Sequence, residues 1–176
     1  MGSVSDLVEQ PLGIEQLGER FRALVEDPRF ANVQGKVELD AWGRIIVSPA
    51  SNLHALLQGR LIARLAVGGG EVLAEASVAT AAGVLVADVA WMSPESADAL
   101  GTQTPFPRAP DLCVEIASPS NSKAALEGKV AAYLKSGARE VWVVHPQSRQ
   151  ITAFGPEGAL DRPSITIEML GLFDSA

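Results

Sequence analysis

An acidic residue lies in the middle of the most strand-like run of this sequence. The run Val84–Met92 is apolar except for Asp88, and a run of this kind is typical of a buried strand in a sheet. Burying an ionised carboxylate without a partner costs several kcal/mol or forces the group to take up a proton. The fold must therefore supply Asp88 with a compensating charge or ion.

A second acidic residue, Glu115, lies in the apolar run Leu112–Ala117. Strand alternation places Glu115 on one face with Cys113 and Ala117, and Asp88 also has small neighbours on its face. Two carboxylates with small neighbours on adjacent strands suit a hard cation such as Mg²⁺, with waters completing the octahedron. The alternative is that an Arg or Lys side chain pairs with each acid, or that each acid meets water at a strand end.

Amphipathic helices and β-prone runs alternate along the chain. The periodicity predicts helices over Ile14–Glu26, from Pro49 and Ser51 through Val67, and over Lys123–Ser136, with a short turn of helix at Glu95–Leu100. It predicts strands over Val33–Asp40, Arg44–Ser48, Glu71–Ala76, Val84–Met92, Leu112–Ala117, Glu140–Val144, Gln150–Phe154 and Ile165–Leu170. This order predicts a mixed β-sheet flanked by helices, of class α/β or α+β, with an N-terminal helix.

The length of 176 residues suits one domain over residues 1–176, with residues 1–32 as an N-terminal helical extension. The 47% hydrophobic and 20% charged residues exclude a disordered or fibrous chain. One cysteine and two histidines exclude an intrachain disulfide and a Cys/His zinc site. No export signal, lipid anchor or membrane-spanning run is visible, so we expect a cytoplasmic protein.

The formal net charge of −7 opposes indiscriminate binding to phosphate backbones. It excludes a basic nucleic-acid coat, but it leaves room for a small basic site inside an acidic protein. Such a site needs local cations that converge. The candidates are Arg44, Arg60, Arg64, Arg108, Lys123 and Lys129.

The predicted helix after Glu115 presents a lysine to the sheet. Its inward stripe consists of Leu126, Val130, Tyr133 and Leu134. At 100° per residue Lys129 falls within about 40° of Tyr133, whereas Lys135 lies opposite. The Lys129 ammonium could neutralise the carboxylates and hold a phosphate oxygen or the attacking water, with Lys123 one turn earlier at the site entrance. The alternative is a lysine whose stem covers apolar surface while its head reaches solvent.

Three further features each have two interpretations. His54 shares a helix face with Gln58 and Leu61, and a core histidine held by hydrogen bonds is expected there rather than a site residue. Glu38, in the first hairpin, is either a solvated strand residue or a third acid of the site. The turn 118–122 is either a helix cap, which we expect, or a phosphate cradle.

Five segments of the chain carry a family resemblance. They are Val37–His54, Ala87–Ala90, Pro110–Ser120, Lys129–Gly137 and Glu140–Pro146, in which E-x-x-S-P-S followed by K-x-x-x-Y is the most specific part. From about Val37 to Phe154 the chain resembles the Uma2 family. These are bacterial proteins formerly grouped as DUF820 and regarded as restriction-endonuclease-like nucleases of the PD-(D/E)XK superfamily.

The resemblance implies a restriction-endonuclease-like α/β core and Mg²⁺-dependent hydrolysis of DNA phosphodiester bonds, with Mn²⁺ as a substitute ion. Asp88 would be the acid of the "PD" element and Glu115 the "D/E" element. Both would bind the metal together with the carbonyl group of Ile116. Lys129 would be the motif lysine moved from strand to helix, and Glu38 the early acidic residue, which would tune a second metal or a water.

Two positions depart from the family pattern. Ala87 replaces the proline of "PD", and His145 stands where the family usually has Asp before Pro146. A second interpretation therefore stays open: a catalytically silent member that acts as a homo-oligomeric interaction module. The net charge and the 5% aromatic content favour it. In either case a homodimer or higher homo-oligomer is expected, through surface near Ile151 and Phe154 or through the N-terminal helix.

Overall fold

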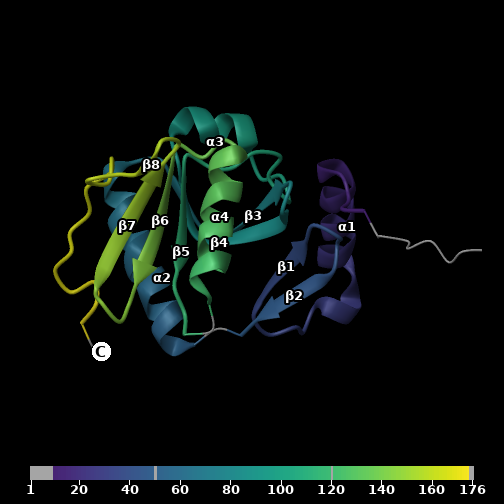
Figure 1. Cartoon of the computed structure of the whole chain (residues 1–176), viewed down its shortest axis with the longest axis horizontal. Coiled ribbons are helices and arrows are strands. Elements are labelled where there is room, and N and C mark those ends of the chain that lie inside the picture. Colours follow the sequence, from purple (N-terminus) through teal and green to yellow (C-terminus); the bar gives the residue numbers. More distant parts are fainter. Residues whose placement is uncertain (1–9, 50, 120, 175–176) are drawn as a thin grey trace, which may run out of the picture.

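The structure is a computed structural model that describes residues 10–49, 51–119 and 121–174 (Figure 1). Within these residues an eight-stranded sheet has the order β2-β1-β4-β5-β6-β7-β8, and β3 pairs with β4. The strands are β1 (Lys36–Asp40), β2 (Ile45–Ser48), β3 (Glu71–Thr80), β4 (Gly83–Met92), β5 (Leu112–Ile116), β6 (Glu140–His145), β7 (Gln150–Gly155) and β8 (Gly158–Ala159). The helices are α1 (Ile14–Glu26), α2 (Asn52–Leu65), α3 (Pro94–Leu100) and α4 (Lys123–Lys135).

The four helices form where the sequence predicts them. Helix α1 has the predicted bounds and ends before Pro28, which opens a 3₁₀ turn. Helices α2 and α4 begin after serines whose hydroxyl groups accept the backbone N–H three residues on: Ser51 from His54, and Ser122 from Ala125. The expectation that the turn before α4 is a helix cap is therefore confirmed at Ser122.

The predicted last strand, Ile165–Leu170, is wrong. That segment contains no strand, and β8 closes the sheet instead by pairing with β7. The isoleucines of the segment pack against the core beside α2. The Arg64 side chain donates hydrogen bonds to the carbonyl oxygens of Glu168 and Leu170. The isoleucine side chains of this segment are thus partly buried, and two of its carbonyl groups are hydrogen-bonded, without a partner strand.

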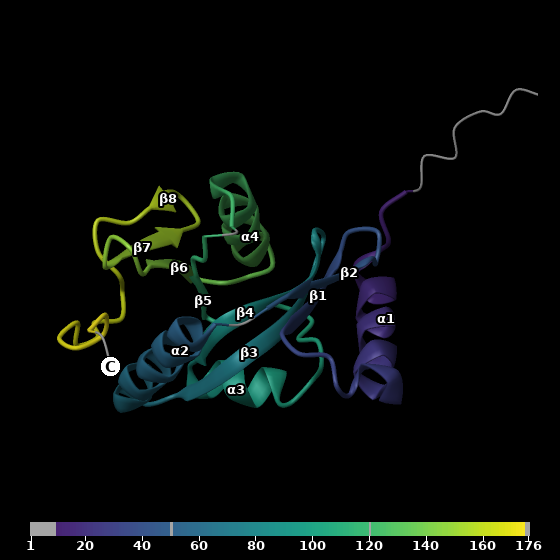
Figure 2. The same cartoon turned by 90° about the horizontal axis from the view of Figure 1, so that it is seen from below.

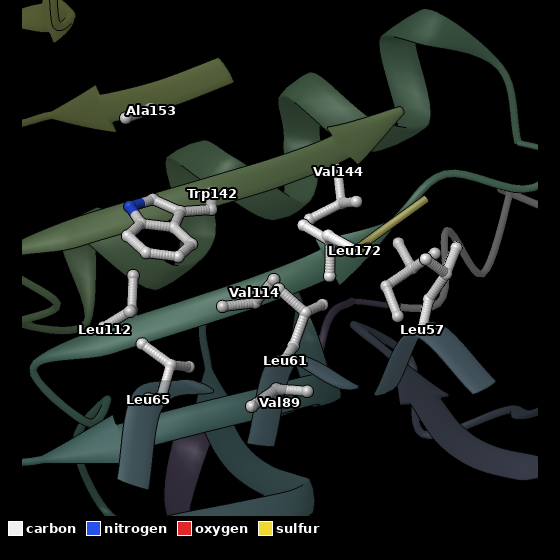
Figure 3. Packing of buried hydrophobic residues seen from close by; sticks show 11 residues of the cluster. Leu57, Leu61, Leu65, Val89, Leu112, Val114, Trp142, Val144, Ala153 and Leu172 are labelled. Carbon is white, nitrogen blue, oxygen red and sulfur yellow. The ribbon is translucent and has the colours of Figure 1, made fainter. Parts of the chain in front are cut away.

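Helices α2 and α4 cover opposite faces of the strands β5 and β6 (Figure 2). On one face, α2 packs its leucines against β4, β5 and β6, with Trp142 and Leu172 filling the layer (Figure 3). On the other face, α4 packs Val130 and Tyr133 against Cys113 of β5. The alternation predicted for β5 is confirmed, because Cys113 faces α4 whereas Leu112, Val114 and Ile116 face α2.

Strands β1 and β5 share one edge of β4. Strand β1 pairs with the start of β4, at Val84 and Gly83. Strand β5 pairs with its end, from Val89 to Trp91. Between these two stretches β1 and β5 diverge, and Figure 1 shows the β1–β2 hairpin set apart from β5, β6 and β7. We call this divergence the fork; the part of β4 that lies in it includes Asp88.

A glycine permits the close approach of β1 to β4 at the fork. Gly83 has a φ of +133°, and a Cβ atom added there would collide with the carbonyl oxygen of Leu39. An L side chain at this position would therefore push β1 away. Because Glu38 precedes Leu39, Gly83 fixes how near Glu38 comes to β4.

Candidate active site

Three buried carboxylates meet at the fork, one from each of its strands. Glu38 comes from β1, Asp88 from β4 and Glu115 from β5, and their side chains are 6%, 1% and 4% exposed. Two lysines, Lys36 and Lys129, pair with them. We call these five residues the fork cluster. Glu38 is buried beside Lys129, so the interpretation of Glu38 as a solvated strand residue is wrong.

Carboxylate oxygens replace the missing strand pairing at the fork. Glu38 Oε1 accepts the backbone N–H of Val86 at 2.7 Å. Asp88 Oδ2 accepts the backbone N–H of Ile116, also at 2.7 Å. Where β1 and β5 leave β4, these side chains thus satisfy amide groups that a sheet ladder would otherwise satisfy. The local fold therefore fixes the position of both acids.

Lys129 faces the sheet, as the helical period predicts. Its Nζ lies 2.8 and 3.0 Å from the two carboxylate oxygens of Glu38 and 3.3 and 3.4 Å from those of Glu115. The side chain is 18% exposed. The solvent-directed alternative is thus wrong, and helix α4 carries the lysine that links the acids of β1 and β5.

Lys36 was absent from the sequence-based site. It lies at the start of β1, and its Nζ is 2.6 Å from Asp88 Oδ1 and 3.4 Å from Glu115 Oε2. The signal that could have found it is strand alternation, because residues two apart on a strand share a face and Lys36 lies two before Glu38. Lys36 therefore belongs to the cluster by the same geometry that brings Glu38 there.

His54 is held by a contact with a buried acid, as expected for an inward-pointing histidine held by hydrogen bonds, but it is only partly buried. His54 Nε2 lies 3.2 Å from Asp88 Oδ1, and its side chain is 22% exposed. One turn later on α2, Gln58 donates to the backbone carbonyl oxygen of Asp88 at 2.6 Å. Helix α2 therefore binds both the side chain and the backbone of this strand residue.

Tyr133 was predicted only as part of the core stripe of α4. It is fully buried, and its hydroxyl group donates a hydrogen bond of 2.8 Å to Glu115 Oε1. Tyr133 lies four residues after Lys129, so both side chains reach the sheet from the same face of α4. Tyr133 thus fixes Oε1 of Glu115, while Oε2 is the oxygen that both lysines contact.

The surroundings shift the pKa values of the two central acids in opposite directions. Burial alone would raise the pKa of Asp88, but the hydrogen bond from His54, the charge of Lys36 and the Ile116 amide outweigh it and lower the pKa to about 2. Burial raises the pKa of Glu115, and the ammonium groups of Lys36 and Lys129 offset this only in part. Asp88 is therefore the acid that stays charged most readily.

Lys36 stays protonated despite its burial. Burial lowers the pKa of a lysine, but the charges of Glu115 and Asp88 outweigh this effect and raise the pKa of Lys36 above its ordinary value. Its ammonium group is therefore a permanent positive charge between two carboxylates.

A cavity of about 500 Å³ opens beside the cluster. His54 and Ile116, which both contact Asp88, form its inner wall. The lining also includes Ser118, Asn121 and His145. His145 is the last residue of β6, so the cavity lies at the C-terminal ends of the parallel strands β5 and β6.

Four other candidate cations have their partners outside the fork cluster. Arg60 and Arg64 donate to carbonyl oxygens of the C-terminal segment. Arg44 pairs with Asp40. Lys123 is 90% exposed and lies 3.7 Å from Glu127, and it does not line the cavity beside the cluster. Among the described residues, the basic side chains that contact the acids of the fork are Lys36, Lys129 and His54.

Comparison with known proteins identifies the family. The model of the Uma2 family, described as "Putative restriction endonuclease", matches residues 19–170. The chain belongs to the Uma2 family. The match is wider than the resemblance over Val37–Phe154 that the motifs indicated. No curated protein matches the sequence.

A crystal structure from Anabaena variabilis, described as a "putative nuclease belonging to DUF820", is similar in fold. The TM-score is 0.63, with 18% sequence identity over 85% of this chain and 96% of that one. The predicted fold class, a nuclease-like mixed sheet flanked by helices with an N-terminal helix, is thereby confirmed. None of the described helices combines the length and apolar character that a membrane-spanning segment needs.

Proposed function

We propose that this Uma2 protein is a Mg²⁺-dependent endonuclease that hydrolyses phosphodiester bonds in DNA. One observation carries the proposal: Asp88 Oδ1 and Glu115 Oε2, from adjacent strands, turn toward the same positive charge. Family membership supports a nuclease, and the fork cluster supplies the groups that such chemistry requires.

The donor set at the fork fits Mg²⁺. Each acid gives one oxygen to a fixed donor, the Ile116 amide or the Tyr133 hydroxyl. The other oxygen faces basic side chains that a cation could replace: Lys36 and His54 at Asp88, and Lys36 and Lys129 at Glu115. The described residues hold no group of three or more His, Cys, Asp or Glu side chains placed to share a metal ion. Mg²⁺ does not need one, because it commonly binds through one or two carboxylates and keeps several waters. The carbonyl group of Ile116 would complete the protein ligands.

Side chains of the fork cluster would orient the reacting groups and stabilise the charge that develops on the phosphate. A bound Mg²⁺ would polarise the phosphate and lower the pKa of its water. Lys129 would orient the attacking water or stabilise negative charge on the phosphate oxygens. Glu38 would hold Lys129 in place and tune a water or a second ion, while Tyr133 would keep Glu115 in one orientation.

The cavity beside His54 supports an approach of the phosphodiester from the C-terminal ends of β5 and β6. Hydroxyl, amide and imidazole side chains line it, which suits hydrogen bonding to sugar and phosphate oxygens. With a net charge of −7 and most arginines engaged elsewhere, the protein would grip few phosphates. We therefore expect binding to DNA that is weak and only modestly reduced by salt, because the salt dependence grows with the number of phosphates that a protein contacts.

Nicking of supercoiled plasmid DNA tests the proposal. The wild-type protein should nick the plasmid with Mg²⁺ or Mn²⁺ and stop when a chelator is added. Asp88→Asn should abolish this activity, whereas Glu127→Gln, an exposed carboxylate on α4, should retain it. Chelator-sensitive cleavage that survives Asp88→Asn would refute the assignment.

A second function is favoured by one feature of the cluster. All three carboxylates already have ammonium partners, so the fold is electrostatically satisfied without a metal. A catalytically silent homo-oligomeric module would look the same, and the edge strand β2 exposes Ile45, Ile46 and Val47 for pairing with a second copy. Mg²⁺ should raise the melting temperature of the nuclease but not of the silent module. Light scattering would give the mass of the oligomer.

A further inference from the structure

Lys36 is the one member of the fork cluster to which the proposed reaction assigns no task. Its side chain is 12% exposed, and its ammonium group lies between Asp88 and Glu115. The oxygens that it contacts, Asp88 Oδ1 and Glu115 Oε2, are the two that the Ile116 amide and the Tyr133 hydroxyl leave free. The lysine therefore occupies the place that a divalent ion would need.

We propose that Lys36 is a resident cation that holds the metal site together in the metal-free protein and must leave before a divalent ion can bind. This inference rests on the proposed function. Without Lys36, the carboxylates of Asp88 and Glu115 would face each other in a buried site, which is costly for like charges. Lys36 is the basic group that contacts both oxygens, whereas His54 contacts only the Asp88 oxygen and Lys129 only the Glu115 oxygen. With Lys36 in place, a metal cannot bridge the two.

The charges of the cluster favour replacement of the Lys36 ammonium group by a divalent ion over binding of the ion beside Lys36. Three carboxylates and two ammonium groups leave one net negative charge. Replacing the Lys36 ammonium by a divalent ion brings the cluster to neutrality, whereas adding the ion beside Lys36 would leave an excess positive charge. In a buried site an uncompensated charge of either sign is unfavourable.

The two lysines differ in how readily they can leave. Lys36 is the first residue of β1 and follows Gly35, whose φ is +110°. Its flexible stem can carry the ammonium group from this strand end to solvent. Lys129 projects from within α4 and contacts both oxygens of Glu38 as well as Glu115. We therefore expect Lys36 to leave and Lys129 to stay when metal binds.

Calorimetric titration of Mn²⁺ into the metal-free protein tests the exchange. If the conformer with Lys36 withdrawn is a minor state of about 10% or less, it weakens the apparent affinity by about tenfold or more. Lys36→Met and Lys36→Gln should therefore bind Mn²⁺ at least about tenfold more tightly than wild type. Lys135→Met, which removes an exposed lysine from α4, should match wild type.

A second readout uses the wild-type chain, in case the Lys36 variants do not fold. Amine-reactive labelling followed by mass spectrometry should modify Lys36 faster when Mn²⁺ is present, because the displaced side chain reaches solvent. Lys129 should not become more reactive. The two measurements thus report on displacement and on affinity independently of cleavage.

The outcomes separate this inference from the function on which it rests. Tighter Mn²⁺ binding by the variants and metal-dependent labelling of Lys36 would support it. Equal Mn²⁺ affinities, with Lys36 still protected, would overturn the exchange but leave a metal site. No Mn²⁺ binding by wild type or by either variant would overturn both the exchange and the metal-dependent nuclease.

Discussion

The chain buries carboxylates at both ends of β5 and at the start of its neighbour β6, and the partners of these carboxylates differ in kind. At the C-terminal end of β5, Glu115 belongs to the fork cluster and contacts two lysine ammonium groups. At the N-terminal ends, Asp111 precedes β5 and Glu140 opens β6. We call these two residues the anchor pair; both are about as buried as the fork acids.

The anchor pair is bound mainly by neutral donors. Asp111 Oδ2 accepts the backbone N–H of Ser93 at 2.8 Å, and its one cation, Arg139, is 75% exposed. Glu140 accepts hydrogen bonds from the indole of Trp142 and from the backbone and hydroxyl groups of Ser164. These contacts tie a loop or a neighbouring segment to the sheet. One oxygen of the pair, Asp111 Oδ1, faces a cation, the exposed guanidinium group of Arg139.

The comparison shows that a buried acid is not by itself the mark of a site. What distinguishes the fork is the partner: amines on long stems and an imidazole beside a cavity, all of which can be exchanged for an ion or a substrate. Fixed amide and indole donors can only hold a structure together. The ligands of open α/β sheets also gather beyond the carboxyl ends of the strands, where the fork cluster lies.

The largest expected effect is the difference in the rate of plasmid cleavage between Glu115→Gln and Glu140→Gln. Loss of a metal-binding carboxylate removes several kcal/mol of transition-state stabilisation, so Glu115→Gln should slow plasmid cleavage by about a thousandfold or more. Glu140→Gln should cleave within about threefold of wild type, because its contacts are remote from the fork. Initial nicking rates at saturating Mg²⁺ measure both.

Urea denaturation should show that Glu140 contributes to the stability of the fold. Glu140→Gln cannot accept all the hydrogen bonds of Trp142 and Ser164, so its free energy of unfolding should fall by about 1–3 kcal/mol. The exposed Glu157→Gln is its control and should leave stability unchanged. If Glu140→Gln lost cleavage while keeping its stability, the division into site and anchor would be wrong.

The features that the sequence predicts correctly are those that depend on one segment of the chain. The bounds of α1, the faces of β5 and the orientation of Lys129 follow from periodicity along one element, and all three were predicted. The acids Asp88 and Glu115 stand out because a carboxylate is unusual within an apolar run. Both kinds of signal are local in the chain.

The missed features depend on contacts between distant segments. Lys36 lies in a polar stretch at a strand start, and only the fork brings it to Asp88 across 52 residues of sequence. His54 has the pattern of an ordinary helix core, and its acid partner comes from β4. Glu140 was predicted as part of a strand without any sign of burial, since Ser164 binds it from a segment expected to precede another strand.

Protonation of Asp88 should lower the free energy of unfolding by an amount between the other two effects. The ordinary pKa of an Asp carboxyl group is 3.8, and folding lowers that of Asp88 to about 2. The unfolded chain therefore binds the proton first as pH falls. The stabilisation, about 2 kcal/mol, is complete above about pH 4 and is lost as pH approaches 2.

The slope of unfolding free energy against pH checks this sign in the metal-free protein. Asp88→Asn should lose less stability than wild type between pH 5 and pH 2, because it has no proton to take up. Glu115 acts in the opposite sense, since its raised pKa favours the folded state as pH falls, but it is present in both proteins. The exposed Asp98→Asn should keep the wild-type slope, and the same slope in Asp88→Asn would contradict the assigned pKa.

The smallest effect is expected at Lys123, which shares α4 with Lys129. Lys123 lies 3.7 Å from Glu127 in an exposed i,i+4 pair, and such pairs contribute at most a few tenths of a kcal/mol. Lys123→Ala should therefore change the unfolding free energy by less than about 0.5 kcal/mol and leave Mn²⁺ affinity and nicking at wild-type values. Lys129→Met removes the same charge from the fork and should abolish nicking. Equal losses in the two variants would mean that the general charge of α4 matters, and not the position of one ammonium group between Glu38 and Glu115.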